Sequence, residues 1–369
     1  MEREALLWKS IPGQKVVCNL CNHYCLIDDG KLGHCQVRLN KEGKLFTLNY
    51  GLTSGLAIDP IEKKPFFHFK PGTNVISFGA PGCNFRCLNC QNWDLSQAPR
   101  LAGSSLDHRP LFSGFVEILP GKIVDVAIAK ACDGYAYTYS EPTIFFEYAL
   151  DTIREAKVRH QNAYHVFVSN GYFSKQLFEL IVKENLLDAI RIDLKFIKDE
   201  KYREVTSGSI KPVLANIKAV WESGIHTEVI NLIIPSYNDS IDEIRELVIA
   251  VKQISPKIPL HFSAFHPDYK LSHIEPTSVE VLLNAKKIAE DEGMEYVYIG
   301  NVMMRGVEDT YCPKCRKLLI ERNGFSVLKN VFAPKEAQIN EKTQVHSNSF
   351  KSHVFPVCPY CGYRINIVL

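Results

Sequence analysis

The order of apolar runs and helical patterns is the feature that most restricts the fold of this chain. Short β-like runs cover residues 74–79, 135–140, 165–169, 189–196, 227–234, 260–264 and 295–299. Amphipathic stretches with helical spacing lie between them, at 123–132, 143–159, 174–186, 213–223, 240–254 and 277–292. This alternation indicates a parallel sheet with crossover helices. The repeated units predict an α/β fold built as an open, partial (β/α) barrel.

Polar side chains stand where the predicted strands end, and they are the first candidates for a cofactor site. They are Ser140, Glu141, Asn170, Asp193, Lys195 and His266. Chemistry in such folds sits at the carboxyl ends of the strands, so we expect these side chains to share one rim. Asp193 and Lys195 alternate onto one face of their strand. Burying such charges is costly unless they are paired or bound to a ligand, so a structural ion pair and a ligand site both fit.

Three cysteines, Cys83, Cys87 and Cys90, follow the first of these runs at the spacing C-x3-C-x2-C. Cysteine thiolates are the usual protein ligands of a [4Fe–4S] cluster, and three of them leave one iron open for a substrate or cofactor. A zinc site with its fourth ligand elsewhere is the alternative. Zinc ligands more often come as C-x2-C pairs from two separate turns, so the spacing favours the cluster.

The chain has 12 cysteines, and all but Cys132 belong to three groups. In a cytosolic protein, clustered cysteines are more often metal ligands than disulfides. Cys132 follows a helical pattern, and we expect it to be a small buried side chain. The first group is Cys18, Cys21, Cys25 and Cys35. Zinc and an auxiliary iron–sulfur cluster both fit this closed group, and zinc is favoured because short four-cysteine sites are its usual structural form.

The last group consists of two C-P-x-C turns, Cys312 with Cys315 and Cys358 with Cys361. Two C-x2-C turns that supply four thiolates are typical of a zinc ribbon, and a second electron-transfer cluster is the alternative. A polar insert at 333–352, which we expect to be a loop, separates them. The chain therefore divides into a cysteine-rich N-terminal unit at 1–70, a barrel at 71–305 and a zinc-ribbon-like unit at 306–369.

Charge and hydropathy exclude some classes of partner. The formal net charge is +2, so no global basic field points to nucleic acid, although basic residues near the last cysteines leave RNA open. The first residues lack the apolar core of a secretory signal. No run approaches the ~18 apolar residues of a membrane span. We expect a cytoplasmic protein with no membrane partner.

The cysteine loop and its place after the first strand resemble the signature of radical S-adenosylmethionine (SAM) enzymes. The resemblance implies that the open iron binds the amino and carboxylate groups of SAM. The reduced cluster then passes one electron to the sulfonium, the C5′–S bond breaks, and a 5′-deoxyadenosyl radical abstracts a hydrogen atom. Such chemistry belongs to the cofactors, while the protein positions them and excludes side reactions. An electron donor such as a ferredoxin or flavodoxin is implied as a partner.

The same resemblance, to the branch that includes pyruvate formate-lyase activating enzymes, assigns roles to several of the candidates. Ser140 and Glu141 correspond to a motif that meets the amino group of SAM, without its usual glycine pair. Asp193 and Lys195 match a cofactor-binding Asp-x-Lys pair, and His266 matches a histidine at the ribose. Two residues around the third cysteine, Asn89 and Gln91, would approach the adenine. Asn89 is a departure, because that position is usually aromatic.

A closer resemblance covers nearly the whole chain. The N-terminal cysteines, segments 59–69, 83–93 and 298–302, and the cysteine pair after them resemble the radical SAM member of the AmmeMemoRadiSam system. This implies Memo-like and AMMECR-like proteins as partners and specifies no substrate. An incompletely closed barrel admits the edge of a macromolecule, and a small molecule also fits. Activation of a glycyl-radical enzyme and a non-catalytic, zinc-stabilised partner-binding scaffold are the alternatives.

Overall fold

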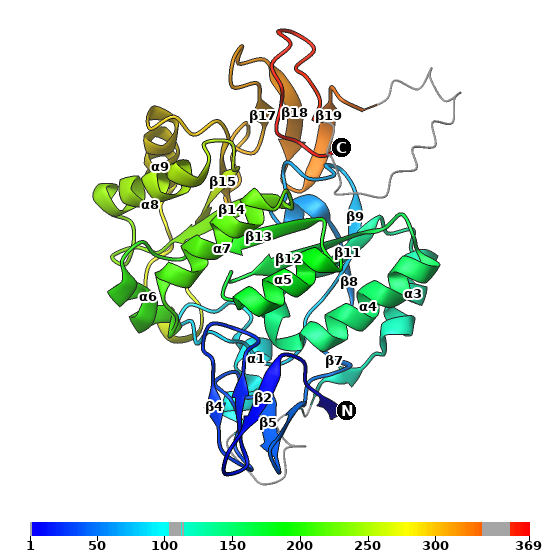
Figure 1. Ribbon diagram of the computed structural model, residues 1–369. Coiled ribbons are helices and arrows are strands. Elements are labelled where there is room, and N and C mark those ends of the chain that lie inside the picture. The colour runs from blue at the N-terminus through cyan, green and yellow to red at the C-terminus, as the bar shows by residue number, and fades with distance from the viewer. Residues whose placement is uncertain (1, 103–111, 113, 334–354) are drawn as a thin grey trace.

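A computed structural model describes residues 2–102, 112, 114–333 and 355–369, so most of the insert at 333–352 lies outside the described residues. The centre of the molecule is an eight-stranded sheet with the order β16-β15-β14-β13-β12-β11-β9-β8 (Figure 1). Its strands are β8 (Ala57–Pro60), β9 (Asn74–Phe78), β11 (Gly134–Tyr137), β12 (Tyr164–Ser169), β13 (Ala189–Asp193), β14 (His226–Ile233), β15 (Leu260–Ala264) and β16 (Val297–Gly300).

The strands from β9 to β16 are parallel and follow one another in chain order, and β8 pairs antiparallel with β9. This sequential order is the winding of a (β/α) barrel. The two edge strands β8 and β16 are not paired with each other in the described part of the chain, so the sheet stays open. The prediction of an α/β fold with a parallel sheet is confirmed, and the predicted strands agree with the observed ones within a few residues.

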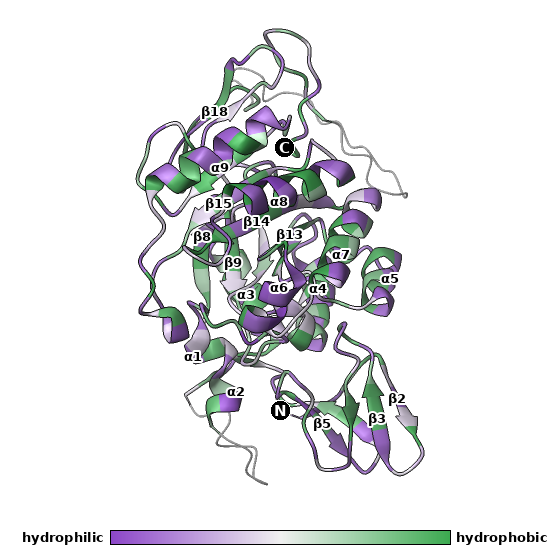
Figure 2. Ribbon diagram, turned by 90° about the vertical axis from the view of Figure 1, so that its left-hand side faces the viewer, coloured by the Kyte–Doolittle hydropathy of each residue, from purple (hydrophilic) through white to green (hydrophobic). Residues whose placement is uncertain are grey.

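Amphipathic helices connect the parallel strands, and Figure 2 shows their polar and apolar sides. They are α3 (Pro120–Ala129), α4 (Phe146–Arg159) after the 3-10 turn η3 (Pro142–Phe145), α5 (Lys175–Lys183), α6 (Asp199–Thr206), α7 (Ile210–Glu222), α8 (Ile241–Ile254) and α9 (Val279–Asp291). Ser174, Ser240 and Ser278 cap α5, α8 and α9 by accepting a hydrogen bond from a backbone N–H of the first turn. The sequence patterns missed α6, which is short and mostly polar. Among the described residues, no helix is both long and apolar enough to cross a membrane.

Small antiparallel sheets lie at opposite ends of the central sheet (Figures 1 and 2). At one end are β1 (Arg3–Glu4), β2 (Trp8–Ile11), β3 (Lys15–Cys18), β4 (Leu26–Ile27), β5 (Arg38–Lys41), β6 (Lys44–Thr47), β7 (Leu52–Thr53) and β10 (Val116–Glu117). At the other end are β17 (Thr310–Tyr311), β18 (Leu318–Asn323) and β19 (Ser326–Asn330). Residues 57–60 of the predicted N-terminal unit form β8 of the central sheet. The domain boundaries themselves remain predictions.

The amino-terminal side of the sheet is filled by the segment before β9 and by the end of the chain. Glu228 of β14 accepts hydrogen bonds from the backbone N–H groups of His68, at 2.8 Å, and Phe67, at 3.1 Å. Its carboxylate oxygens also lie 3.0 Å and 2.7 Å from Nε2 of His226 and His261. The backbone N–H of Val368 donates to the carbonyl of His68 at 2.8 Å. One buried carboxylate thus joins the sheet to the segment that contacts the chain end.

Burial by itself would raise the pKa of Glu228, but the hydrogen bonds and charges of His226 and His261 outweigh it and lower this pKa well below its ordinary value. The ionised Glu228 carboxylate therefore stabilises the folded state at neutral pH. This stabilisation is lost as the pH falls below about 4.3, the ordinary pKa of glutamate.

We predict that Glu228→Gln lowers the free energy of unfolding by about 3 kcal/mol at pH 7, because an amide cannot accept all of these hydrogen bonds. Urea unfolding measures the change, and Glu280→Gln, at an exposed position of α9, is the matched control with an effect within about 0.5 kcal/mol. The gap between wild type and Glu228→Gln should narrow as the pH falls towards 3. Equal stabilities of the two variants at pH 7 would contradict this role.

Candidate cofactor site

A cavity of about 380 Å³ lies at the carboxyl ends of the parallel strands. Its walls come from the loop after β9, from the ends of β11, β12 and β13, and from the segment after β8. The predicted site residues that line it are Cys83, Cys87, Asn89, Cys90, Gln91, Ser140, Asn170, Asp193 and Lys195. The structure therefore brings together most of the residues that the strand-end pattern and the cysteine spacing nominated.

Close packing holds the cysteine loop in place. Gly79 begins it, and a Cβ at this position would lie 2.3 Å from the carbonyl oxygen of Thr138, the residue after β11. Farther along, the backbone N–H groups of Arg86 and Leu88 donate to carbonyls at the end of α6, at 2.8 Å and 2.9 Å. Phe85 is fully buried in the core. The short helices α1 (Trp93–Ser96) and α2 (Ala98–Leu101) follow the loop. The cysteines are thus set on a fixed backbone beside the cavity.

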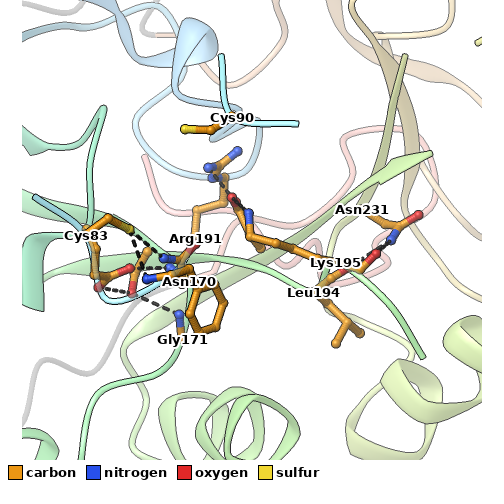
Figure 3. Close-up of polar contacts among 12 residues, drawn as sticks. Cys83, Cys90, Asn170, Gly171, Arg191, Leu194, Lys195 and Asn231 are labelled. Carbon is orange, nitrogen blue, oxygen red and sulfur yellow. Dashed lines mark hydrogen bonds and ion pairs between the residues drawn. The ribbon is translucent and has the colours of Figure 1, made fainter. Parts of the chain in front are cut away.

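The three site sulfurs are buried or half-buried, and those of Cys83 and Cys90 have hydrogen-bond partners. The backbone N–H of Phe85 and the side-chain amide of Asn170 donate to Sγ of Cys83, at 3.4 Å and 3.5 Å (Figure 3). Sγ of Cys90 lies 3.1 Å from the hydroxyl of Ser96. Burial raises the pKa of Cys87 to about 12 and also raises the pKa of the other two thiols. These groups are therefore protonated at neutral pH, and binding a metal would displace their protons.

A chain of charges follows β13 into the same cavity (Figure 3). Asp193 lies between Arg191, at 2.7 Å, and Lys195, at 2.9 Å. Burial by itself would raise the pKa of Asp193, but the two cations outweigh it and lower that pKa. Burial would lower the pKa of Lys195, but the charge of Asp193 outweighs this effect and raises that pKa. Asp193 and Lys195 are therefore both ionised at neutral pH.

Two amide side chains hold the backbone at the end of this charged chain. Asn231 donates to the carbonyls of Leu194, at 2.8 Å, and Lys195, at 3.1 Å (Figure 3). Asn238 donates to the carbonyl of Lys195 at 2.9 Å. Sequence reasoning missed Arg191, although strand alternation places it on the same face as Asp193 and Lys195. This row of three charged side chains contains two cations and one anion. The pairing of Asp193 with Lys195 therefore leaves positive charge beside the cysteines.

The cavity wall holds buried polar atoms that lack partners. Oδ1 of Asn89 and Nε of Arg191 are buried and have no hydrogen-bond partner within the described part of the chain. Both residues line the cavity. Leaving a buried polar atom unpaired costs about 1–3 kcal/mol, so a bound ligand with polar groups would relieve this cost. Three thiols, unpaired polar atoms and a charged wall fit an iron–sulfur cluster together with a charged, polar cofactor.

A second set of charges at the cavity was missed from the sequence. Asp59 of β8 pairs with Lys63 and Lys64, each at 2.7 Å, and accepts a hydrogen bond from Tyr139 at 3.0 Å. The two lysines and the tyrosine line the cavity. The sequence signal for these residues was the run of charges before β9. That run does not stand at the end of a predicted strand, so the strand-end pattern did not select it. Only the pairing of β8 with β9 brings it to the cavity.

Two predicted site residues lie elsewhere. Glu141 is buried beneath the cavity wall, where its carboxylate accepts hydrogen bonds from Thr143, from the Ser169 hydroxyl and, at 2.6 Å, from the backbone N–H of Asn170. It therefore positions Asn170 and is not among the residues that line the cavity. His266 comes two positions after β15 ends and is exposed, whereas Ser263 of the same strand lines the cavity.

The last cysteine group is assembled as predicted, at the far end of the molecule. The sulfurs of Cys312, Cys315, Cys358 and Cys361 all lie within 4.8 Å of one another. Two cross-pairs, Cys312 with Cys361 and Cys315 with Cys358, are 3.6 Å and 3.7 Å apart. This arrangement can hold a metal ion. Cys132 is buried and outside the three groups, as expected.

The first cysteine group lies against the site loop. Cys18, Cys21 and Cys35 are buried, and Cys25 is half-buried. Arg100 links the two regions, because its guanidinium donates to the carbonyls of His34, at 2.7 Å, and Cys83, at 2.9 Å. The contact makes the N-terminal segment part of the support of the site.

The fold and the site define an α/β protein with a cysteine-lined cofactor cavity at the carboxyl ends of a parallel sheet. The model of the radical SAM superfamily matches residues 78–248. An uncharacterized protein of Methanocaldococcus jannaschii is 40% identical over 100% of both chains. The pyruvate formate-lyase-activating enzyme of Clostridium pasteurianum is 23% identical over 57% of this chain and 87% of its own.

Among solved structures, a radical SAM methyltransferase from Sphaerobacter thermophilus is similar with a TM-score of 0.48 and 14% identity, over 63% of this chain and 67% of its own. Residues 78–248 form a radical SAM domain, and the chain is an enzyme. This domain argues against the non-catalytic scaffold that the sequence left open. Membership in the AmmeMemoRadiSam family stays a prediction.

A substitution at Gly82 tests whether the site loop packs against the N-terminal segment. Its φ is +100°, and a Cβ there would lie 2.7 Å from Cγ1 of Val37 and 3.1 Å from the carbonyl oxygen of Cys35. Gly13 is the matched control, because its φ is +81° and nothing lies within 4 Å of its added Cβ. Alanine at either position costs about 1–2 kcal/mol of backbone strain, and at Gly82 the clash adds to it. We predict that Gly82→Ala lowers the free energy of urea unfolding more than Gly13→Ala does, and equal losses would contradict this packing.

Proposed function

We propose that Cys83, Cys87 and Cys90 bind a [4Fe–4S] cluster and that the adjoining cavity binds SAM. When bound and reduced, the cluster supplies one electron to SAM, whose cleavage gives a 5′-deoxyadenosyl radical that abstracts hydrogen from the substrate. The observation that carries the proposal is the convergence of three thiols and the charges of β13 in one cavity of about 380 Å³. Cysteine thiolates are the usual ligands of such a cluster, and three of them leave one iron for another ligand.

The residues around the cavity have separate tasks in this proposal. Asn170 and the backbone N–H of Phe85 hold Cys83 by their hydrogen bonds to its sulfur. Arg191 and Lys195 offer positive charge to the carboxylate of SAM, and Asp193 offers a carboxylate to its cationic groups. All three line the cavity and sit on one strand face, so they can act on the same molecule.

The remaining candidates would orient the rest of SAM. Asn89, whose Oδ1 lacks a partner, and Gln91 border the cavity after the second cysteine, where the adenine is expected. The hydroxyl of Ser140 donates to the carbonyl of Ala80 at 2.6 Å and thereby fixes the edge of the cysteine loop. Glu141 acts through Asn170 in this arrangement. His266 would reach the ribose only by a movement of the segment after β15.

The substrate is unidentified, and we propose that it approaches through the open side of the sheet. The edge strands β8 and β16 are not paired with each other among the described residues, which supports access by the edge of a macromolecule. Lys63 and Lys64 at the cavity would meet an anionic group there. Activation of a glycyl-radical enzyme is the second candidate, and the similarity to the clostridial pyruvate formate-lyase-activating enzyme favours it.

We also propose a zinc ion at the last cysteine group, because tetrahedral zinc with Zn–S bonds of about 2.3 Å places its sulfurs about 3.8 Å apart. The separations of 3.6 Å and 3.7 Å match that spacing. The electron donor would be a ferredoxin or flavodoxin. Memo-like and AMMECR-like proteins are the partners that the resemblance implies, and the cytoplasm is the proposed compartment.

The cluster assignment predicts that Cys87→Ala abolishes SAM cleavage, because the chain loses one of three iron ligands. The protein is reconstituted anaerobically with iron and sulfide and reduced with dithionite. SAM is then added, and 5′-deoxyadenosine, methionine, iron and zinc are measured per chain. Zinc should stay unchanged, since the last cysteine group is at the other end of the molecule. Cys132→Ala is the matched control and should cleave SAM as wild type does. Cleavage retained by Cys87→Ala would refute the assignment.

The role of Lys195 predicts that Lys195→Ala weakens SAM binding at least tenfold, about 1.4 kcal/mol, and leaves the cluster in place. Equilibrium binding of SAM to the oxidised protein measures the dissociation constant without cleavage. Lys257→Ala, at an exposed position before β15, is the control and should bind as wild type does. If Lys195→Ala binds SAM with unchanged affinity, Lys195 serves only as the structural ion-pair partner of Asp193.

A further inference from the structure

The first cysteine group forms a second potential metal centre that the proposed reaction does not use. Cys18 ends β3, and Cys21 forms a bridge with Phe173, in the segment between β12 and α5. Cys25 and Cys35 lie on the turns that follow, and all four thiols are free. Their burial in a segment of small strands argues for a ligand, since four clustered thiols inside a protein are typical of metal sites.

The spacing of the sulfurs differs between the two four-cysteine groups. A single zinc ion holds four sulfurs about 3.8 Å apart, because each Zn–S bond is about 2.3 Å in a tetrahedron. The last group meets this condition, with all four sulfurs within 4.8 Å of one another. Among the described residues, no three cysteines of the first group lie that close together. The same chain thus shows one compact group and one spread group.

An iron–sulfur cluster explains the wider spacing. In a [4Fe–4S] cluster each thiolate binds a different iron, so the four sulfurs lie farther apart than around one ion. Cys83, Cys87 and Cys90 share the spread arrangement, since they too form no group within 4.8 Å. This last comparison rests on the proposed function, whereas the contrast between the two four-cysteine groups does not.

Contacts place the first group directly beside the site loop. Nε2 of His23 lies 2.7 Å from the carbonyl oxygen of Asn84, the residue after Cys83. His23 stacks on His34, with ring centroids 4.0 Å apart. The backbone N–H of His34 donates to Sγ of Cys25 at 3.4 Å, as N–H groups do towards cluster sulfurs. The guanidinium of Arg100 bridges His34 and Cys83.

We infer that Cys18, Cys21, Cys25 and Cys35 bind a second [4Fe–4S] cluster, which lies against the site loop. Zinc has no redox chemistry, whereas an iron–sulfur cluster takes up one electron. A reduced ferredoxin or flavodoxin would supply that electron and would itself be oxidised by one electron. The N-terminal segment then becomes the place where an electron donor would dock.

The test removes the site cluster and counts what remains. A triple variant, Cys83→Ala with Cys87→Ala and Cys90→Ala, is reconstituted anaerobically with iron and sulfide, and iron, sulfide and zinc per chain are measured. We expect about four irons and four sulfides per chain, and an EPR signal of a reduced cluster after dithionite. Adding Cys21→Ala and Cys25→Ala to the triple variant should lower the iron per chain at least tenfold. Adding Cys132→Ala instead is the matched control and should retain it.

Less than about one iron per chain, with about two zinc ions, would overturn the inference, because both four-cysteine groups would then hold zinc. Circular dichroism and the zinc of the last group report whether each variant is folded. Mössbauer spectra of the unaltered chain supply a second measurement, in which a cluster with four cysteine ligands is expected. If the proposed function is wrong, the wild-type protein will leave SAM intact. The iron content of the triple variant will not be affected by that outcome, so the two failures can be told apart.

Discussion

The buried carboxylate of Glu228 is the interaction on which the rest of the structure depends. It binds two backbone N–H groups of the segment before β9 and faces histidines of β14 and β15. In this way it closes the amino-terminal side of the sheet with a segment that in turn contacts the end of the chain. Arg191 pairs in register with Glu228 on the neighbouring strand. The pairing of Arg191 with Glu228 therefore joins the amino-terminal side of the sheet to the charged wall of the cavity.

The cavity is built from charges that neutralise one another only in part. Asp193 lies between two cations, and Asp59 pairs with two lysines that line the cavity. Removing such charges from water is unfavourable, and their pairing offsets that cost only where geometry and hydrogen bonds are good. The excess of positive charge beside neutral thiols supports the proposed binding of a negatively charged cluster and of a cofactor with a carboxylate.

Much of the fold could be predicted because its signals are local. Apolar runs and helical spacing located the parallel strands and most of the helices, and the spacing of Cys83, Cys87 and Cys90 identified the site loop. The polar ends of β11 to β13 nominated Ser140, Asn170, Asp193 and Lys195, which line the cavity. Glu141 and His266 do not line the cavity, because a position near a strand end does not reveal whether the side chain turns inwards. Arg191 was missed although strand alternation places it on the face of Asp193. Lys63 and Lys64 were missed because only the pairing of β8 with β9 brings them to the cavity.

The sequence by itself determined the class of the fold, the three cysteine groups and the end of the sheet where the cavity lies. Each of these follows from the order of residues along one strand or one loop. Only the tertiary structure decided that Glu141 supports Asn170, that β8 brings Lys64 to the cavity, and that the first cysteine group lies against the site loop. It also separated a compact group of four sulfurs from a spread one. The physical reason is that burial, pairing of charges and the spacing of sulfurs are properties of distances between remote segments, which a linear pattern does not contain.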